Sequence, residues 1–448
     1  MFLLRELFFC ARDIRDYLKG LIDTRELDNT PGFDPTFPAL TNAPAIQKFL
    51  YDMMTFYPHC EEALKAPICG ETGIEGLRLD FNFGLRLDVP EGNFHVTISD
   101  ADSGQIFFKQ ALSAVRLVSV EKYFIHWQID VRRDGKKVFS HTLDLEGQPV
   151  LLIVDSRCGL GDSLAFLPSI AAFKSRKRCE LSILFPEYLR DFVARLYPVT
   201  WQVNAINFDN YASYFLSMYT SNVPFCPADH KTTPLKLMAQ LVLGIDTLNA
   251  KPTFKPTAPR VIREPYVCIG VQASLTRKSW LYPGGWNVVV DYLKQIGYRV
   301  LCIDRRAKET GDSITIHKPN GAEDFTGDVS ILERANMLYH AEFFIGLGSG
   351  LAWLAEAVDC PVVMICGFSK DWYEFHTPYR VVNRLVCGGC FNDVRVSFSS
   401  SKMLCPYHNG TARELECQKK ISPRMVINAI EQLIVDKKLE PPALKNFA

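Results

Sequence analysis

The amino-acid sequence predicts an α/β protein with two doubly wound lobes, preceded by a small antiparallel β-domain and a helical N-terminal extension. Two blocks, residues 149–257 and 258–386, alternate unbroken apolar stretches with stretches of helical periodicity. Such apolar stretches are typical of parallel strands that are buried on both faces of a sheet. Residues 76–148 instead alternate polar and apolar positions, which predicts antiparallel strands. A proline-rich linker, residues 251–259, separates the two lobes.

The N-terminal extension, residues 1–75, is expected to be helical. It begins with an apolar stretch, Met1–Phe9, that Arg5 and Glu6 interrupt. We therefore expect an amphipathic helix there rather than a signal peptide or a membrane span. A second helix is expected near residues 45–55. Because no pattern in the extension carries chemistry, packing or assembly is its expected role.

The composition is that of a globular protein without a polyanionic partner. The chain has 448 residues, is 48% hydrophobic and 22% charged, and has a formal net charge of zero. No block of like charge favours binding to nucleic acid or to a membrane surface. Most of the 14 cysteines, such as Cys268 and Cys302, lie singly in apolar strands, which is typical of reduced thiols. We therefore expect a cytoplasmic protein.

The β-domain, residues 76–148, is predicted to form a barrel or a sandwich. Turn sequences such as Asp134-Gly135 separate its strands. At about 70 residues it is small for an independent core, so we expect it to pack on its neighbour. A scaffold role is favoured over the alternative, carbohydrate or peptide binding. The expected strands are Leu77–Phe81, Phe94–Ile98, Phe124–Val131 and Val138–Leu143.

The two lobes are expected to face each other across a cleft at the carboxyl ends of their strands. A helix near Pro423–Val435, within the C-terminal segment 421–448, is expected to cross back and brace the first lobe. The strands expected are Val150–Val154 and Leu181–Phe185 in the first lobe and Tyr266–Val271, Tyr298–Ile303, Phe343–Ile345 and Val362–Ile365 in the second. The second lobe is also expected to contain helices at Trp286–Ile296, Ser330–His340 and Leu351–Val358.

A carboxylate is expected at the cleft in the first lobe. The turn Gly159-Leu160-Gly161-Asp162 follows strand Val150–Val154 and precedes a helix. Asp162 can cap that helix, which is a purely structural role. It can also face the cleft and act as a general base toward an acceptor hydroxyl. The sequence leaves both interpretations open.

A phosphate-binding turn is expected opposite, in the second lobe. Gly348-Ser349-Gly350 lies between the strand Phe343–Ile345 and a helix. This arrangement directs free backbone N–H groups at an anion, and the glycines allow a phosphate to approach the backbone. An ordinary strand–helix crossover without a ligand is an equally good interpretation of this stretch alone.

Two loops of the second lobe are also expected at the cleft. The loop after the strand Tyr266–Val271 carries Thr276 and Lys278, and this lysine can neutralise a diphosphate. The loop before the helix Ser330–His340 carries Asp324, Phe325 and Thr326, where the phenyl ring can border a base and the hydroxyl a phosphate. The structural alternatives are a solvated loop and a helix-entry turn.

The most specific chemical pattern is the set Cys387, Cys390, Cys405 and Cys417. Its spacing, Cys-x2-Cys-x14-Cys-x11-Cys within residues 387–420, predicts a four-thiolate metal finger. Free thiols and disulfides are the less favoured alternatives, and His408 is a less favoured substitute ligand. Four thiolates suit zinc or iron. With all four positions filled by protein, we expect a structural site.

These motifs together resemble the bacterial autotransporter heptosyltransferases, a family related to the lipopolysaccharide heptosyltransferases. The resemblance covers roughly residues 76–420 and leaves the N-terminal extension uncovered. The stretches that carry it are Asp88-Val89-Pro90-Glu91-Gly92, Gly159–Asp162, Ala322–Gly327, Phe344–Leu351 and the four cysteines with Cys405-Pro406.

The resemblance implies a GT-B fold, with two Rossmann-like lobes and a sugar nucleotide between them. It implies inverting transfer of heptose from ADP-heptose to serines of an autotransporter adhesin passenger domain in the bacterial cytoplasm. It also implies a large ring-like homo-oligomer, a dodecamer by family resemblance. The alternatives are a glycosyltransferase with another sugar nucleotide or acceptor, and a non-catalytic binding or chaperone protein on the same fold.

The resemblance also assigns roles to residues of this chain. Asp162 is the implied catalytic base, and iron, with zinc as the alternative, is the implied metal on the four cysteines. No Asp-x-Asp motif lies in the expected place, so no catalytic divalent metal is expected. Lipopolysaccharide heptosyltransferases have Asp-Thr-Gly and a histidine where this chain has Gly348-Ser349-Gly350 and Trp353, so a lipid-linked acceptor is not expected here. The resemblance also implies that Lys278 binds the donor. Together with the loops and the turn described above, the expected donor-binding residues are Thr276, Lys278, Asp324, Phe325, Thr326, Gly348, Ser349 and Gly350.

Overall fold

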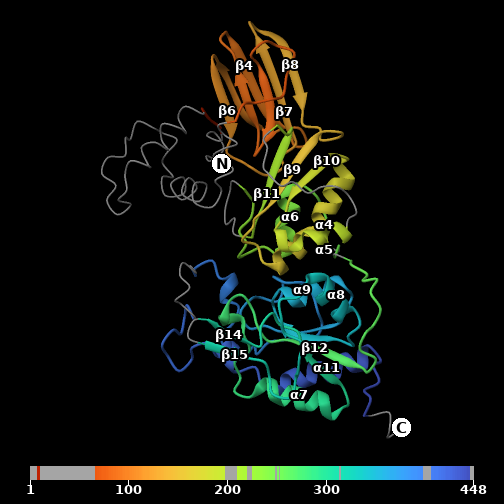
Figure 1. The fold of residues 1–448 in the computed structure, drawn as a ribbon. Coiled ribbons are helices and arrows are strands. Elements are labelled where there is room, and N and C mark those ends of the chain that lie inside the picture. The colour runs from red at the N-terminus through yellow and green to blue at the C-terminus, as the bar shows by residue number, and fades with distance from the viewer. Residues whose placement is uncertain are drawn as a thin grey trace.

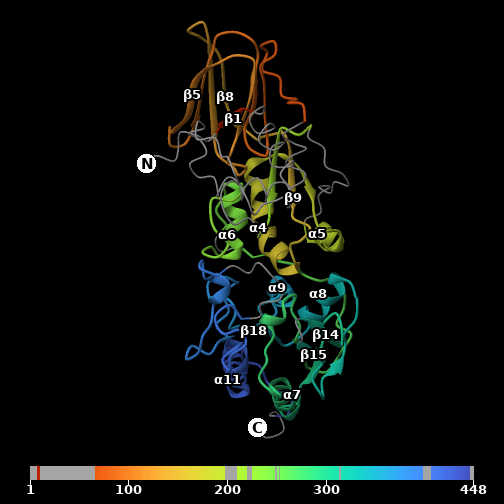
Figure 2. The ribbon, with the colours of Figure 1, turned by 90° about the vertical axis from the view of Figure 1, so that its left-hand side faces the viewer.

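A computed structural model describes residues 8–10, 66–196, 209–218, 225–247, 250–251, 253–311, 314–396 and 405–443. The molecule is elongated. A β-rich end that contains the four-stranded sheet, the helices of a first lobe and a second lobe follow one another along its long axis (Figures 1 and 2). No helix in the described part of the chain is both long and apolar enough to cross a membrane.

The first lobe is built on a seven-stranded mixed sheet. Strands β2, β11, β9 and β10 are parallel, whereas β3, β6 and β1 continue the sheet in antiparallel pairing. Helices α4 (Leu160–Lys177), α5 (Arg190–Leu196) and α6 (Leu235–Leu243) belong to this lobe. The strand order is β1 (Phe8–Cys10), β6 (Val115–Ser119), β3 (Arg86–Val89), β2 (Arg78–Asn82), β11 (Ala212–Leu216), β9 (Pro149–Val154) and β10 (Glu180–Leu184).

This sheet changes two expectations about the N-terminal part of the chain. Phe8–Cys10 pairs with Val115–Ser119 as a strand, where an amphipathic helix was expected, so that part of the prediction was wrong. The sheet also takes in β2, β3 and β6, so it crosses the boundary expected at residue 148. The helix expected near residues 45–55 lies outside the described residues.

The remaining strands of the β-domain form a separate antiparallel sheet. Its inner face buries alternate apolar residues completely, including Phe94, Val96 and Ile98, as the period-two pattern requires. The strand order is β5 (Ile106–Leu112), β4 (Phe94–Asp100), β7 (Trp127–Arg133) and β8 (Lys136–Thr142).

The second lobe has a fully parallel six-stranded sheet of the doubly wound type. Numbered in chain order, its strands lie in the order 3-2-1-4-5-6, so the order reverses between β12 and β17. Ligands of such sheets bind at that reversal, beyond the carboxyl ends of the strands. The strand order is β16 (Glu323–Asp324), β13 (Arg299–Cys302), β12 (Tyr266–Gly270), β17 (Phe344–Leu347), β18 (Val362–Ile365) and β19 (Arg380–Val381).

Helices α7 (Gly285–Gln295), α8 (Ile331–Tyr339), α9 (Gly350–Ala357) and α11 (Pro423–Asp436) surround this sheet. The expected return of the last helix to the first lobe is wrong, because α11 packs against α7, β18 and β19 of the second lobe. The Trp280 indole donates to the carbonyl of Ile421 at 2.8 Å, which fixes the chain on the second lobe just before α11 begins. A hairpin of β14 (Lys308–Gly311) and β15 (Ile314–His317) was not expected from its polar sequence.

The two lobes meet where α4 and α9 begin. A Cβ at Gly161 would lie 2.8 Å from the Trp353 side chain, and a Cβ at Gly350 would lie 2.7 Å from that of Leu160. Side chains at these positions would therefore force the helices apart. The contact is also bridged by the ion pair of Lys236 and Glu356 at 3.1 Å.

Candidate active site

The candidate active site is a cavity of about 840 Å³ between the lobes, which we call the inter-lobe cavity. Its volume is typical of small-molecule sites. The first lobe lines it with Gly159, Leu160, Gly161, Asp162, Tyr188, Met218 and Leu235. From the second lobe, the residues with polar or charged side chains are Gln272, Ser274, Lys278, Asp304, Arg305, Glu309, Asp328, Ser330, Arg334, Ser349, Tyr373 and Glu374.

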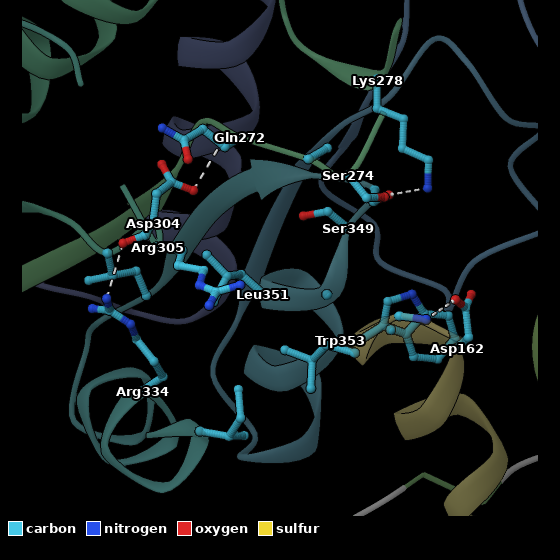
Figure 3. Close-up of a pocket in the computed structure, with 18 of the residues that line it drawn as sticks. Asp162, Gln272, Ser274, Lys278, Asp304, Arg305, Arg334, Ser349, Leu351 and Trp353 are labelled. Carbon is cyan, nitrogen blue, oxygen red and sulfur yellow. Dashed lines mark hydrogen bonds between the residues drawn. The ribbon is translucent and has the colours of Figure 1, made fainter. Parts of the chain in front are cut away.

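Asp162 lies in the first turn of α4, at the rim of the cavity (Figure 3). Its Oδ2 accepts a hydrogen bond from the backbone N–H of Gly159 at 2.8 Å. Asp162 therefore caps α4 and lines the cavity in the same conformation. Burial raises the pKa of the Asp162 carboxyl, and the positive charge of Lys278 opposes that rise. A raised pKa makes a carboxylate a stronger base.

Lys278 faces Asp162 from the second lobe. It ends the short helix Thr276–Lys278, and its Nζ donates to the carbonyl of Gly348 at 3.2 Å (Figure 3). This hydrogen bond holds the cation beside the turn that opens α9. Because Ser349 is the N-cap of α9, the first amides after it have no partner within the helix. A lysine and a helix N-terminus together form a site for a diphosphate.

Asp304 and Arg334 organise the other end of the cavity. Asp304 is buried at the carboxyl end of β13 and accepts hydrogen bonds from the amides of Val271 at 2.8 Å and Gln272 at 3.2 Å. Burial raises its pKa to about 6. The guanidinium of Arg334 donates to the carbonyls of Phe325 at 2.6 Å, Gly327 at 2.8 Å and Asp304 at 3.0 Å. It thereby fixes the turn after β16 against the end of β13.

The structure brings together part of the expected site. Asp162, Lys278 and the turn Gly348-Ser349-Gly350 line the inter-lobe cavity. The other four expected donor-binding residues are not among the residues that line it. Asp324 instead accepts hydrogen bonds from the amide and hydroxyl of Thr326, at 3.0 and 2.6 Å. Phe325 is partly buried against the main core, and Thr276 faces Gly311 of the β14–β15 hairpin.

Sequence reasoning missed the three buried charged residues that line the cavity, Asp304, Arg334 and Glu374. Asp304 directly follows an expected strand, so its position at a carboxyl end was a usable signal. Arg334 is a charged residue on the buried face of an amphipathic helix, which is a weaker signal. Glu374 lies in an irregular segment after β18, where no periodicity marks it.

The four cysteines are neighbours in the second lobe, because their charges influence one another. The negative charge of each of Cys387, Cys390 and Cys405 raises the pKa of the Cys417 thiol, although burial is the larger cause. Burial, then the neighbouring Cys405 and Cys387, raises the pKa of Cys390 to about 12. Neighbouring thiols can lose their protons together when a cation binds them, and thiolate ligands suit a thiophilic metal ion.

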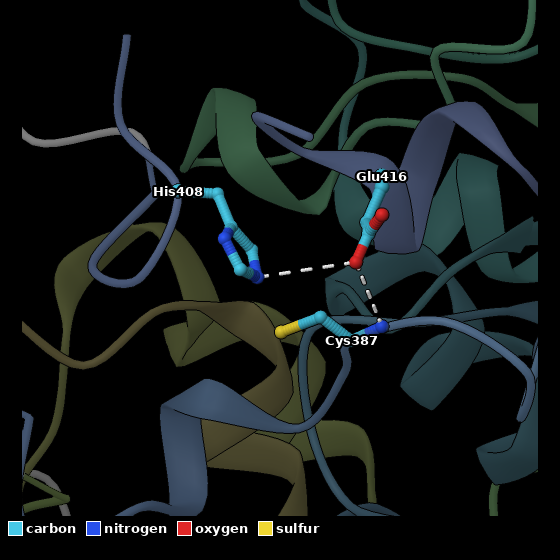
Figure 4. A group of neighbouring side chains, drawn as sticks. All are labelled: Cys387, His408 and Glu416. Carbon is cyan, nitrogen blue, oxygen red and sulfur yellow. Dashed lines mark hydrogen bonds and ion pairs between the residues drawn. The ribbon is translucent and has the colours of Figure 1, made fainter. Parts of the chain in front are cut away.

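His408 and Glu416 lie beside this group. One ligand atom each of Cys387, His408 and Glu416 lies within 4.8 Å of the others (Figure 4). Arg413 binds both carboxylate oxygens of Glu416 and is the main reason that its pKa is lowered to about 2. That carboxylate also accepts the amide of Cys387 at 3.1 Å. Glu416 therefore positions the finger. In the described part of the chain, the group of possible ligand atoms within 4.8 Å of one another is Cys387, His408 and Glu416 rather than three of the four cysteines, so the four-thiolate site stays a prediction.

The finger supports the loop that carries Lys278. Gln418, fully buried on α10 (Glu416–Lys419), donates its side-chain amide to the carbonyl of Arg277 at 3.1 Å. The carbonyl of Gln418 in turn accepts the amide of Leu281 at 3.3 Å. Because Gln418 is adjacent to Cys417, ordering of the cysteine cluster fixes the backbone beside Lys278.

Comparison with known proteins identifies two matching families. Residues 73–135 match the glycosyltransferase TibC N-terminal domain, and residues 234–388 match glycosyltransferase family 9 (heptosyltransferase). The chain is 39% identical over 376 residues to the autotransporter heptosyltransferase TibC of Escherichia coli O78:H11, across 81% of this chain and 91% of that relative. It is 32% identical over 372 residues to the inactive autotransporter heptosyltransferase BimC of Burkholderia thailandensis, across 81% and 87%.

Solved structures of TibC share the fold. The crystal structure of the iron-containing dodecameric glycosyltransferase TibC from enterotoxigenic Escherichia coli H10407 superposes with a TM-score of 0.78 at 37% identity. The match covers 83% of this chain and 99% of that one. A TibC structure in complex with ADP-D-β-D-heptose matches with the same TM-score, identity and coverage.

The buried hydrogen bonds of Arg334 give a testable stability prediction. Arg334→Met leaves three carbonyls at the cavity without their donor, which should lower the free energy of unfolding by about 3 kcal/mol. Arg305→Met is the matched control, because Arg305 pairs with Asp328 on the exposed surface and such pairs contribute little. Thermal unfolding measures both variants. Equal melting temperatures for the two variants would contradict the role of Arg334.

Proposed function

The chain belongs to the autotransporter heptosyltransferases, and we propose that it transfers heptose from ADP-heptose to serine hydroxyls of an autotransporter adhesin in the bacterial cytoplasm. It is a family 9 glycosyltransferase with a GT-B-like fold. One observation carries the proposal: a carboxylate on one wall of the inter-lobe cavity faces a lysine and a helix N-terminus on the other. The relative that was crystallised with ADP-D-β-D-heptose supports the choice of donor.

The proposed chemistry is an inverting displacement. Asp162 takes the proton of the acceptor hydroxyl as its oxygen attacks the anomeric carbon, which passes through an oxocarbenium-like transition state. Negative charge develops on the departing ADP. The ammonium of Lys278 and the free amides at the start of α9 stabilise that charge, because they are fixed in place before the reaction.

The cysteine cluster has a structural part in this proposal. Cys387, Cys390, Cys405 and Cys417 would hold iron, as the iron-containing TibC suggests, with zinc as the alternative. The bound metal would fix the finger and, through Gln418, the loop with Lys278. We extend the dodecameric assembly of TibC to this chain as part of the same proposal.

Incubation of the pure protein with ADP-heptose and a serine-rich passenger fragment tests the transfer. Mass spectrometry of the fragment should show the added mass of heptose. Transfer only from a different sugar nucleotide would change the assigned donor. No transfer from any donor would favour a non-catalytic role, and the inactive relative BimC makes that a concrete alternative.

Removal of the base should stop transfer without preventing donor binding. Asp162→Asn should lower kcat at least about a hundredfold, because it removes general-base catalysis. The dissociation constant of ADP-heptose should stay within a few-fold of the wild-type value. Asp191→Asn is the matched control, since Asp191 is also in a first helical turn but is exposed and away from the cavity. A near wild-type rate for Asp162→Asn would overturn the assignment.

The pH dependence of kcat should report the same carboxylate. Only the ionised Asp162 is a base, and burial raises its pKa above the usual 3.8, so kcat should fall on acidification at a pH above that value. The charge of Lys278 lowers this pKa, so Lys278→Met should move the acid limb to higher pH. The measurement is kcat at saturating donor over roughly five pH units, from about pH 4 to about pH 9. If the acid limb of Lys278→Met stays at the wild-type pH, a group other than Asp162 controls kcat.

If the four cysteines hold a metal ion, removal of one of them should lower both the metal content and the stability of the finger. Cys417→Ser should lower the metal content measured by elemental analysis, lower the melting temperature and weaken ADP binding through the Lys278 loop. Cys69→Ser is the control, because Cys69 is an exposed thiol in the first lobe's periphery. Elemental analysis of the wild type also distinguishes iron from zinc. Full metal content in Cys417→Ser would contradict the assignment of this ligand.

A further inference from the structure

Glu374 is a charged residue at the inter-lobe cavity that the proposed mechanism does not use. It follows β18, the strand beside β17, and it lines the cavity although its side chain is only 3% exposed. A carboxylate is rarely buried to this extent without a partner or a function. Its place in the cavity and its hydrogen bonds indicate both.

The carboxylate of Glu374 is held rigidly from behind. The hydroxyl of Ser369 lies 2.7 and 2.8 Å from its two oxygens, and Nη2 of Arg380 donates to Oε2 at 2.8 Å. The thiol of Cys366 contacts Oε1 at 3.9 Å. A hydroxyl donates one proton, so these groups supply three donors, one of them weak, to a carboxylate with about four acceptor positions. At least one acceptor position is left for a ligand.

Glu374 also lies directly against the diphosphate-binding turn. A Cβ at Gly348 would lie 2.6 Å from Oε1 of Glu374, so only glycine allows this approach. The carbonyl of the same Gly348 accepts the hydrogen bond of Lys278. The carboxylate is therefore next to the groups that would bind the diphosphate, on the side of β17 that faces β18.

The two ends of the cavity differ in the strands that form them. Asp304 and Arg334 lie at the ends of β13 and β16, on one side of the strand-order reversal. Glu374 lies past the end of β18, on the other side. A nucleotide sugar whose diphosphate lies at the reversal extends in both directions from it. Asp162 lies on the other side of Ser349 from Asp304 and Arg334 (Figure 3). A sugar whose anomeric carbon faces Asp162 therefore fits the Glu374 side, and the nucleoside fits the Asp304 side.

We propose that Glu374 is a specificity-determining residue that accepts a hydrogen bond from a hydroxyl of the transferred sugar. The inference rests on the proposed function, because it takes the ligand to be a nucleoside diphosphate sugar. A fixed carboxylate discriminates strongly against a sugar that lacks the matching hydroxyl, since the buried acceptor is then left unpaired. The pairing with Arg380 holds the carboxylate in the orientation that this contact needs.

The test compares two ligands, ADP-heptose and ADP, by isothermal titration calorimetry on the full chain. Glu374→Gln removes the charge with little change of shape, and should weaken ADP-heptose binding at least tenfold while changing ADP binding less than twofold. Glu431→Gln is the matched control, because Glu431 is a glutamate of the same lobe that pairs with Arg424 on α11 and does not line the cavity. It should affect both ligands alike and only slightly.

Other outcomes would overturn the inference. If Glu374→Gln weakens the binding of ADP-heptose and of ADP equally, Glu374 only supports the Gly348 turn. If it weakens the binding of neither ligand, Glu374 does not contact the sugar. Should Glu374→Gln unfold, Glu374→Asp keeps the charge near Arg380 but withdraws it from the cavity, and the same split between the ligands is expected. Failure of the wild type to bind ADP-heptose would instead refute the proposed function.

Discussion

The contact between the first turns of α4 and α9 is the constraint on which the site depends. Gly161 leaves room for Trp353 of the second lobe, and Gly350 leaves room for Leu160 of the first lobe. The two helices, one from each lobe, therefore approach closely at their N-termini. That approach sets Asp162 opposite the Ser349 turn. A cavity with reacting groups on both walls is a consequence of this contact, and neither lobe could form it alone.

The two helices begin in similar ways but use their N-termini differently. In α4 the positive end of the helix dipole is satisfied by the carboxylate of Asp162, which also reaches the cavity. In α9 the N-cap Ser349 makes no side-chain capping hydrogen bond, so the amides there are available to an anion. Lys278 completes the anion site, and Gln418 of the cysteine finger holds its loop. The proposed metal and donor sites are therefore connected through short contacts.

The sequence predicted best where local pattern determines structure. The parallel strands, the turn at Asp162 and the Gly348 turn follow from apolar runs and glycines, and the structure places both turns at one cavity. Prediction failed where contacts between residues that are far apart in the sequence determine the structure. The strand at Phe8–Cys10 forms because Val115–Ser119 offers it an edge. Glu374 is set by Arg380 and Ser369, which no local pattern connects to it.

The mechanism depends on where the sugar nucleotide binds, so the decisive measurement is a structure of this protein with ADP-heptose. We expect the diphosphate to lie against Lys278 and the first amides of α9, with the anomeric carbon facing Asp162 across the cavity. A donor bound elsewhere on the protein, or bound in the cavity with its anomeric carbon turned away from Asp162, would refute this mechanism.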